Sequence, residues 1–268
     1  MKNTEAIKAT NLSIGYPKRT VLTDISFSIP PGSVTAVIGA NGTGKSTLLK
    51  TLSGVISPLD GTVELNGRDL STISRRELAK LMAIVYTDRT NGAGGLTVRE
   101  LVELGRYPHT GYLGHLTAND RNIVEESIVS LGIESKATSF LSDISDGERQ
   151  KAMIARALAQ ETPVILLDEP TSYLDAASRL DILDLVRRLA DTHGRTILLS
   201  THDTAPSLAI SDIVMTIAPT ETPAVAVGTP DDVQFAERMN RIFPNRGISF
   251  NPLTRDFEKN CSIEGTIL

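Results

Sequence analysis

One stretch of this chain decides its fold, and it reads Gly39-Ala40-Asn41-Gly42-Thr43-Gly44-Lys45-Ser46-Thr47. It fits the pattern G-x-x-x-x-G-K-[ST], which is typical of loops that bind phosphate groups. Residues 34–38 before it form a short, largely apolar and β-branched run, as in a buried strand. Leu48, Leu49 and Leu52 after it recur at helical spacing. Because the pattern requires a strand, a loop and a helix in this order, we predict a phosphate-binding loop here.

The residue types explain how such a loop would bind a nucleotide. The glycines let the backbone curl and approach a ligand closely, so that N–H groups and the helix N-terminus face an anion. We expect Lys45 to reach the β- and γ-phosphates and the Ser46 hydroxyl to ligate Mg²⁺. A glycine-rich turn with a chance lysine is the alternative, which the flanking strand and helix disfavour. The predicted ATP-binding residues of the loop are Gly39, Asn41, Gly42, Thr43, Gly44, Lys45, Ser46 and Thr47.

The overall composition narrows the classes of protein to which the chain can belong. Its 268 residues, 40% of them hydrophobic, suffice for one large α/β domain or for one domain with a smaller insertion. The net charge of −5 argues against a protein that binds nucleic acid. The single cysteine, Cys261, cannot form an internal disulfide, and no apolar run approaches the ~18 residues of a membrane span. We therefore expect a protein of a reducing compartment that reaches any membrane through a partner.

The order of the predicted elements indicates an α/β fold with a mostly parallel sheet. Short strands are predicted at residues 6–12 and 26–29, before the phosphate loop. From about residue 91 to 160 the pattern is mostly helical and lacks strand signals, so we predict a helical insertion. Beyond it, strands alternate with helices, which implies crossovers between parallel strands. After residue 230 a short helix is predicted over 231–242, followed by a polar tail.

Two carboxylates, Asp168 and Glu169, end a predicted strand at residues 164–167. Ligands of such sheets lie at the C-terminal ends of the strands, so Asp168 is placed to hold the Mg²⁺ that Ser46 ligates. Glu169 is placed to orient and polarise a water that attacks the γ-phosphate. A solvated acidic strand end without a role is the alternative, which the phosphate loop upstream disfavours.

A histidine, His202, follows another predicted strand at residues 196–200 and should lie at the same edge of the sheet. We expect it to contact the γ-phosphate and to hold the attacking water. A purely structural histidine is the alternative, since a lone histidine at a strand end is often structural.

A third motif, residues 144–150, precedes a predicted helix. Ser145 caps that helix, Glu148 follows three residues later, and Gly147 permits a close backbone approach. The simplest interpretation is a capping box and nothing more. The functional interpretation is a second helix N-terminus that binds an anion. One site does not need two such ends from one chain, so this end would serve a neighbour's nucleotide in a symmetric dimer.

Together these motifs resemble those of the ATP-binding-cassette (ABC) ATPases, in the same order and spacing over about residues 5 to 230. The family's phosphate loop corresponds to residues 39–47, and its acidic strand end corresponds to Asp168 and Glu169. Its signature segment, usually Leu-Ser-Gly-Gly-Gln/Glu, corresponds to residues 144–148. Its D-loop, switch histidine and adenine-stacking aromatic correspond to residues 172–175, His202 and Tyr16.

The resemblance implies a P-loop NTPase core with a mostly parallel sheet, an N-terminal antiparallel β subdomain and a helical subdomain insertion. It implies one ATPase domain over residues 1–230 and a short C-terminal extension over 231–268. It also implies that the chain binds ATP and Mg²⁺ and closes head to tail as a homodimer. Each ATP would then lie between the phosphate loop of one chain and Ser145, Gly147 and Glu148 of the other.

Two departures from the family pattern matter. The signature has Ile144 for leucine and Asp146 for the first glycine, and both substitutions are tolerable at a helix cap. The family also usually places a glutamine after the strand predicted at residues 82–86, where it contacts Mg²⁺ and the water. Here Thr87 or Asp88 takes that place, and the carboxylate of Asp88 can ligate Mg²⁺ directly or through water.

The segment at residues 105–112 looks like the ATPase subunits of importers for iron–siderophore, haem and cobalamin. In that group the helical subdomain, here about residues 87–120, receives the membrane permease, and a substrate-binding protein acts indirectly. Aromatic residues and Arg106 in an exposed loop suit such an interface. His109 and His115 lack a carboxylate between them and are a weak metal pair. The expected location is the cytoplasmic face of the inner membrane, as a peripheral subunit.

Three alternatives remain open from the sequence. The chain can serve an importer for another metal or solute, or an exporter. It can be a soluble ABC protein acting on ribosomes, DNA repair or iron–sulfur assembly, although it has one cassette, no heptad run and a net charge of −5. It can also be a non-catalytic adaptor gated by ATP, because the glutamine is missing.

Overall fold

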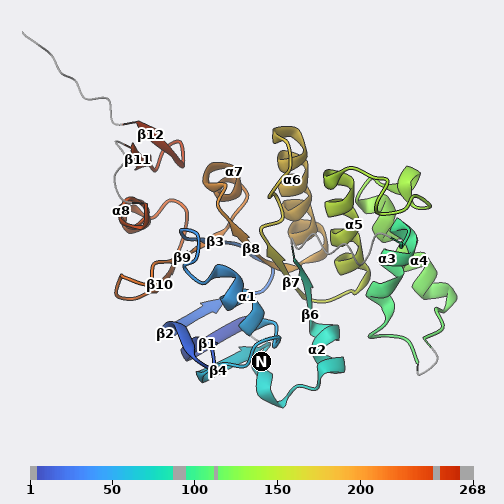
Figure 1. Cartoon of the computed structure of the whole chain (residues 1–268), viewed down its shortest axis with the longest axis horizontal. Coiled ribbons are helices and arrows are strands. Elements are labelled where there is room, and N and C mark those ends of the chain that lie inside the picture. Colours follow the sequence, from blue (N-terminus) through green and yellow to red (C-terminus); the bar gives the residue numbers. More distant parts are fainter. Residues whose placement is uncertain (1–4, 87–94, 112–113, 244–247, 260–268) are drawn as a thin grey trace, which may run out of the picture.

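A six-stranded sheet forms the centre of the computed structural model, which describes residues 5–86, 95–111, 114–243 and 248–259 (Figure 1). The strand before the phosphate loop, β3 (Val34–Ile38), lies between β8 and β9 in the middle of this sheet. The other strands, in sheet order from the edge, are β10 (Val225–Gly228), β9 (Ile213–Ile217), β8 (Thr196–Thr201), β7 (Val164–Asp168) and β6 (Met82–Val85). All neighbours pair in parallel except β10 with β9. The predicted mostly parallel sheet is confirmed.

Helices cover both faces of this sheet, and the strands are therefore almost entirely apolar. The face toward α1 (Lys45–Leu52) carries Val164 and Leu166 of β7. The opposite face carries Ile165 and Leu167, which pack with α6 (Ala176–His193). A shorter helix, α7 (Thr204–Ala209), lies against β3. Burial on both sides holds the carboxyl ends of the strands, where the candidate site lies, in fixed relative positions.

A separate antiparallel sheet packs under α1, in the strand order β2-β1-β4-β5 (Figure 1). Its strands are β1 (Ile7–Tyr16), β2 (Arg19–Ile29), β4 (Asp60–Leu65) and β5 (Arg68–Asp69). We predicted only short strands before the loop, whereas β1 and β2 form one long hairpin. Three register shifts along this hairpin break the regular alternation of buried and exposed residues, so its full length is not evident from the sequence. The hairpin places Tyr16 directly opposite Arg19.

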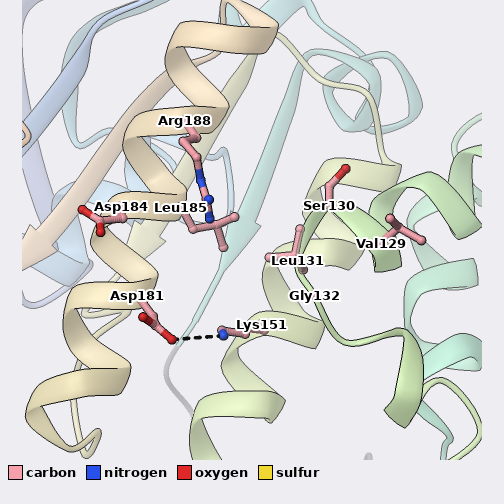
Figure 2. A pocket seen from close by; sticks show the side chains of 9 residues that line it. All are labelled: Val129, Ser130, Leu131, Gly132, Lys151, Asp181, Asp184, Leu185 and Arg188. Atoms are coloured by element: carbon pink, nitrogen blue, oxygen red, sulfur yellow. Dashed lines mark hydrogen bonds and ion pairs between the residues drawn. The ribbon is translucent and has the colours of Figure 1, made fainter.

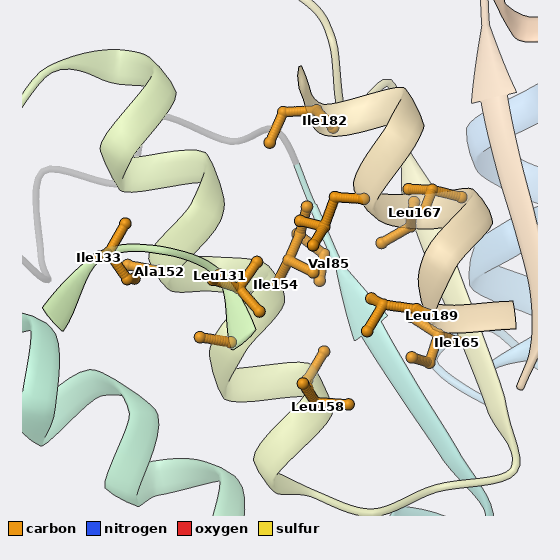
Figure 3. Close-up of a cluster of buried hydrophobic side chains, with 14 of the residues drawn as sticks. Val85, Leu131, Ile133, Ala152, Ile154, Leu158, Ile165, Leu167, Ile182 and Leu189 are labelled. Carbon is orange, nitrogen blue, oxygen red and sulfur yellow. The ribbon is translucent and has the colours of Figure 1, made fainter. Parts of the chain in front are cut away.

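The helical part of the chain contains α3 (Val98–Glu103), α4 (Ala118–Ser130) and α5 (Asp146–Ala159). Each of these helices, like α2 (Arg75–Leu81) before them, begins with a complete capping box. Figure 3 shows how α5 joins the helical part to the sheet: Ile154 and Leu158 belong to the same buried cluster as Val85, Ile165 and Leu189. Short 3-10 turns occur at Leu70–Thr72, Leu104–Arg106 and Glu134–Lys136.

Arg106 corrects one prediction, because it is buried rather than exposed for a partner. Only 3% of it is accessible. Its Nε donates to Asp120 Oδ1 at 2.9 Å, and its Nη1 donates to the Ala159 carbonyl at 2.6 Å and to Glu161 Oε2 at 2.7 Å. Hydrogen bonds from Thr117, together with Arg106, lower the pKa of Asp120 to about 2. A guanidinium has five donors, so a buried arginine can hold a loop against the end of a helix. The sequence alone does not distinguish such a buried arginine from one that is exposed to a partner.

The C-terminal region is the second correction, because the predicted polar tail contains a packed hairpin. After α8 (Val233–Ile242) come β11 (Ile248–Asn251) and β12 (Asp256–Lys259), which pair antiparallel. Phe250 contacts Phe235 and Phe257 edge-to-face, with ring centroids 5.5 and 5.4 Å apart. This cluster covers Ala36 and Ile38 of β3. The phenylalanines lie too far apart in the sequence to produce a periodic signal.

In the described parts of the chain, no helix has the length and apolarity to cross a bilayer.

Candidate functional site

The phosphate-loop segment leaves the end of β3 and enters α1, as predicted. A side chain at Gly39 would place its Cβ 2.7 Å from the Ile217 carbonyl, and Gly44 has a φ of +109°. Both positions therefore require glycine. Gly44 also stands at the N-cap of α1 and offers no side chain to bond the first N–H groups. The start of α1 consequently keeps its positive end available to an anion.

Lys45 lies inside this loop and is only 5% accessible. Its Nζ donates to the carbonyls of Gly39 at 2.7 Å and Ala40 at 3.2 Å. Burial lowers the pKa of Lys45, and the negative charges of Glu169 and Asp168 act in the opposite direction. The loop thus encloses a lysine ammonium whose nearest strong charges are two carboxylates.

The acidic strand end of β7 meets α1 at this loop. Asp168 Oδ1 accepts a hydrogen bond from the Ser46 hydroxyl at 3.1 Å and another from the Ser200 hydroxyl at 2.7 Å. The sequence predicted that Ser46 and Asp168 lie together, and the structure places them in contact although 122 residues separate them. Ser200 was not predicted as a site residue. Its signal was a serine directly after the apolar run Ile197-Leu198-Leu199, in the strand that leads to His202.

Glu169 and His202 also come together, at the adjacent ends of β7 and β8. The distance from His202 Nδ1 to Glu169 Oε2 is 3.6 Å, and the imidazole side chain is 56% accessible. Glu169 has a left-handed backbone, with φ +50°, and its Oε2 accepts from the Ser172 hydroxyl at 2.9 Å. The carboxylate is therefore held between two side chains beside the phosphate loop, where a water molecule can reach it.

Arg179 connects the two loops that follow these strand ends, and it was also missed. Its Nε donates to the Leu174 carbonyl at 3.2 Å, and its Nη1 donates to Asp203 Oδ2 at 2.9 Å. Leu174 belongs to the predicted D-loop, and Asp203 follows His202. The position of Arg179 on the first turn of α6 explains the contact, but a surface arginine on a helix gives no such signal in the sequence.

A cavity of about 440 Å³ opens above the phosphate loop. Two further predicted residues, Gly39 and Thr43, shape the loop below it, where the Thr43 hydroxyl donates to the Ala40 carbonyl at 2.8 Å. Arg19 was not predicted; it lines the cavity because the hairpin sets it opposite Tyr16. The lining residues are Tyr16, Arg19, Val21, Asn41, Gly42, Gly44, Lys45, Ser46, Thr47 and Glu169.

The predicted signature residues do not line this cavity. Ser145 caps α5: its hydroxyl accepts from the Glu148 N–H at 3.2 Å, and Glu148 Oε2 accepts from the Ser145 N–H at 2.9 Å. The Ser145 N–H and the Ser145 hydroxyl both donate to the Glu148 carboxylate, and these two hydrogen bonds lower the pKa of Glu148. A side chain at Gly147 would place its Cβ 3.1 Å from the Ser178 hydroxyl. Asp88, predicted to ligate metal, and Thr87 lie outside the described residues.

A second cavity, of about 390 Å³, lies between the end of α4, α5 and α6 (Figure 2). Lys151 Nζ lies 3.3 Å from Asp181 Oδ2, so an ion pair joins α5 to α6 across it. It shares no lining residue with the cavity above the phosphate loop. The predicted site residues therefore gather at the first cavity or at the start of α5.

Comparison with known proteins decides the family. Residues 22–172 match the model of the family described as ABC transporter, which is more than half of the chain. The chain belongs to the ABC transporter family. It is an ATPase of that family, and its cassette binds ATP.

Several relatives of this cassette are known. The iron(3+)-hydroxamate import ATP-binding protein FhuC of Bacillus subtilis is 40% identical over 230 residues, which is 84% of this chain and 85% of the relative. The ferric enterobactin transport ATP-binding protein FepC of Escherichia coli is 37% identical, over 88% of this chain and 86% of the relative. A dimeric structure of the cassette MJ0796 bound to ADP and Pi has a TM-score of 0.69 and 26% identity, over 78% of this chain and 93% of that one.

Proposed function

We propose that this cassette drives an importer that carries an iron–siderophore, haem or cobalamin through a membrane permease. The observation that carries the proposal is the meeting of Ser46, Asp168, Glu169 and His202 beside one cavity. This arrangement supports hydrolysis, which a non-catalytic adaptor would not need. The names of FhuC and FepC favour an iron chelate among the three cargoes.

The residues present fit the binding of Mg²⁺ together with ATP. The Ser46 hydroxyl and the Asp168 carboxylate are the hard oxygen donors that this ion prefers, and they already touch at 3.1 Å. When bound, the ion would neutralise charge on the β- and γ-phosphates. Lys45 would exchange its bonds to loop carbonyls for bonds to these phosphates. Asp88 is proposed as a further ligand.

Glu169 and His202 are proposed to prepare the attacking water. The Glu169 carboxylate accepts the hydrogen bond of that water and polarises it toward the γ-phosphate. His202, 3.6 Å away, would hold the water and the γ-phosphate from the other side. Tyr16 is proposed to stack on adenine at the mouth of the cavity.

The second half of each site is proposed to come from a second copy of the chain. Ser145, Gly147 and Glu148 lie away from their own chain's cavity, and the related cassette MJ0796 forms a dimer with ADP and Pi. In a head-to-tail pair these residues would face the partner's γ-phosphate. The ATPase domain is proposed to span residues 1–230.

The permease is proposed to bind about residues 87–120, which lead into and begin the helical subdomain of about residues 91–160. Tyr107, with 58% of its surface accessible, supports a contact there. A substrate-binding protein would act indirectly, through the permease. This arrangement would place the chain at the cytoplasmic face of the inner membrane, as a peripheral subunit.

The Glu169→Gln variant tests the catalytic assignment. It should still bind MgATP, accumulate ATP-dependent dimers and lose about 10²–10⁴-fold in steady-state turnover, because general-base assistance is removed. Phosphate release measures the turnover, and light scattering measures the dimers. Glu126→Gln, an exposed change on α4, is the matched control and should leave both unchanged. Unchanged hydrolysis in Glu169→Gln would remove Glu169 from the mechanism.

A further inference from the structure

Ser200 is a polar residue at a fully buried position of the central sheet. It lies near the end of β8, directly opposite Asp168 in the parallel register, and none of its surface is accessible. Leu198 and Leu199 before it are buried apolar residues. A hydroxyl buried among such residues requires hydrogen-bond partners, and the identity of those partners shows what it holds.

The Ser200 hydroxyl bonds both residues of the acidic strand end. It donates to Asp168 Oδ1 at 2.7 Å and accepts from the Glu169 N–H at 2.9 Å. One hydroxyl therefore clamps the side chain of Asp168 and the backbone of Glu169 at the same time. Ser46 donates to the same Oδ1 from α1 at 3.1 Å, so two hydroxyls, one from α1 and one from β8, hold this carboxylate.

The backbone of Glu169 explains why a clamp is useful. Its φ of +50° lies in the left-handed region, which non-glycine residues adopt only when the surrounding structure holds them there. This turn directs the Glu169 side chain toward Ser172 and His202 instead of along the strand. The bond from its N–H to Ser200 fixes the peptide from which that turn begins.

We propose that Ser200 is a positioning residue that aligns Asp168 to hold Mg²⁺ and Glu169 to face the attacking water. Ser200 does not line the cavity above the phosphate loop, so it acts through these two carboxylates. The inference rests on the proposed function of Asp168 and Glu169. Groups that orient metal ligands in this way commonly change metal affinity or activity about 10–100-fold when they are removed.

The Ser200→Ala variant tests the proposal, with Mn²⁺ as the probe and its binding to the ATP-loaded chain measured by electron paramagnetic resonance. We expect Mn²⁺ to bind about 10–100-fold more weakly and steady-state hydrolysis to fall in parallel. ATP binding in EDTA should stay within about twofold, because no contact to the phosphate loop is lost. Ser200→Thr keeps a hydroxyl at the same atom and should restore most of the Mn²⁺ affinity.

Thr35→Val is the matched control for losing a buried hydroxyl from the sheet. Thr35 lies on β3, is fully buried, and its hydroxyl has no hydrogen-bond partner among the described residues. This variant should keep wild-type Mn²⁺ affinity. Wild-type Mn²⁺ affinity in Ser200→Ala, even with a lowered melting temperature, would overturn the proposal. A wild-type chain that binds Mn²⁺ with ATP but does not hydrolyse it would instead overturn the proposed function.

Discussion

The N-termini of α1 and α5 differ in how they are capped, although both are proposed to face phosphate. At α1 the N-cap is Gly44, which gives the helix no side-chain partner. At α5 the N-cap is Ser145, and a complete capping box with Glu148 satisfies the first turn within the chain. The start of α1 is therefore built to be completed by a ligand, whereas the start of α5 is stable on its own.

This difference indicates the order in which the two halves of the proposed site bind the nucleotide. The N–H groups at the start of α1 have no side-chain cap, so a bound anion would complete them. The first turn of α5 is already capped within the chain, so it is stable without a ligand and can remain exposed until a second, nucleotide-bound chain binds. We infer that ATP binds first to the phosphate loop and that α5 joins afterwards.

The largest effect should come from removing the charge at the α1 end. Lys45→Ala should weaken ATP binding by at least about 30-fold, because a buried charge pair is worth about 2–5 kcal/mol. Fluorescence titration with a labelled ATP measures the affinity. Lys50→Ala, on the same helix but outside the cavity, is the control and should bind normally. Unaltered ATP affinity in Lys45→Ala would count against the assignment of the loop.

A smaller effect is expected at the α5 end, from Ser145→Ala. Loss of the cap should lower the free energy of unfolding by about 1 kcal/mol. Hydrolysis should fall by more than the loss of folded protein explains, while ATP binding to the single chain stays the same, because the proposed contact of Ser145 is to the partner's nucleotide. Urea unfolding and phosphate release measure the two effects.

Thr97→Ala removes the same kind of capping box from α3 and provides the comparison. It should cost similar stability and leave the hydrolysis of the isolated protein unchanged. If both variants reduce hydrolysis equally, the start of α5 acts only through stability.

The smallest effect concerns the charge of Glu148. Its pKa is lowered in the folded chain by the Ser145 hydrogen bonds, so the charged form stabilises the fold. That contribution, about 0.5 kcal/mol for an acid in the first turn of a helix, is complete above the ordinary pKa near 4.5. It is lost as the pH falls through the lowered value. Glu148→Gln should therefore be less stable than the wild type at pH 7 in urea unfolding, and the gap should narrow at an acidic pH well below the ordinary pKa of Glu148. A gap that is the same at both pH values would contradict this.

The sequence predicted best what depends on neighbouring residues. The phosphate loop and the capping box of α5 are local patterns, and the buried strands are short apolar runs. The meeting of Ser46 with Asp168 was also predictable, because parallel strands end at one edge of the sheet.

Three of the misses depend on contacts between distant residues. Arg106 is buried because Asp120 and the end of α5 surround it, and no local pattern reports that. The β11–β12 hairpin is held by phenylalanines that meet only after folding. Ser200 gains its partners from the register between two strands that a whole helix separates in the sequence.

Because of the strand order around β3, the nucleotide site can form only late in the synthesis of the chain. Both neighbours of β3, β8 and β9, belong to the last third of the chain. During synthesis at about 5–20 residues per second, β3 must wait on the order of ten seconds for its first neighbour. The phosphate loop is among the first segments made and among the last to be completed. A ribosome that stops before β8 therefore releases a chain that contains the whole loop sequence but cannot form the sheet that gives the loop its shape.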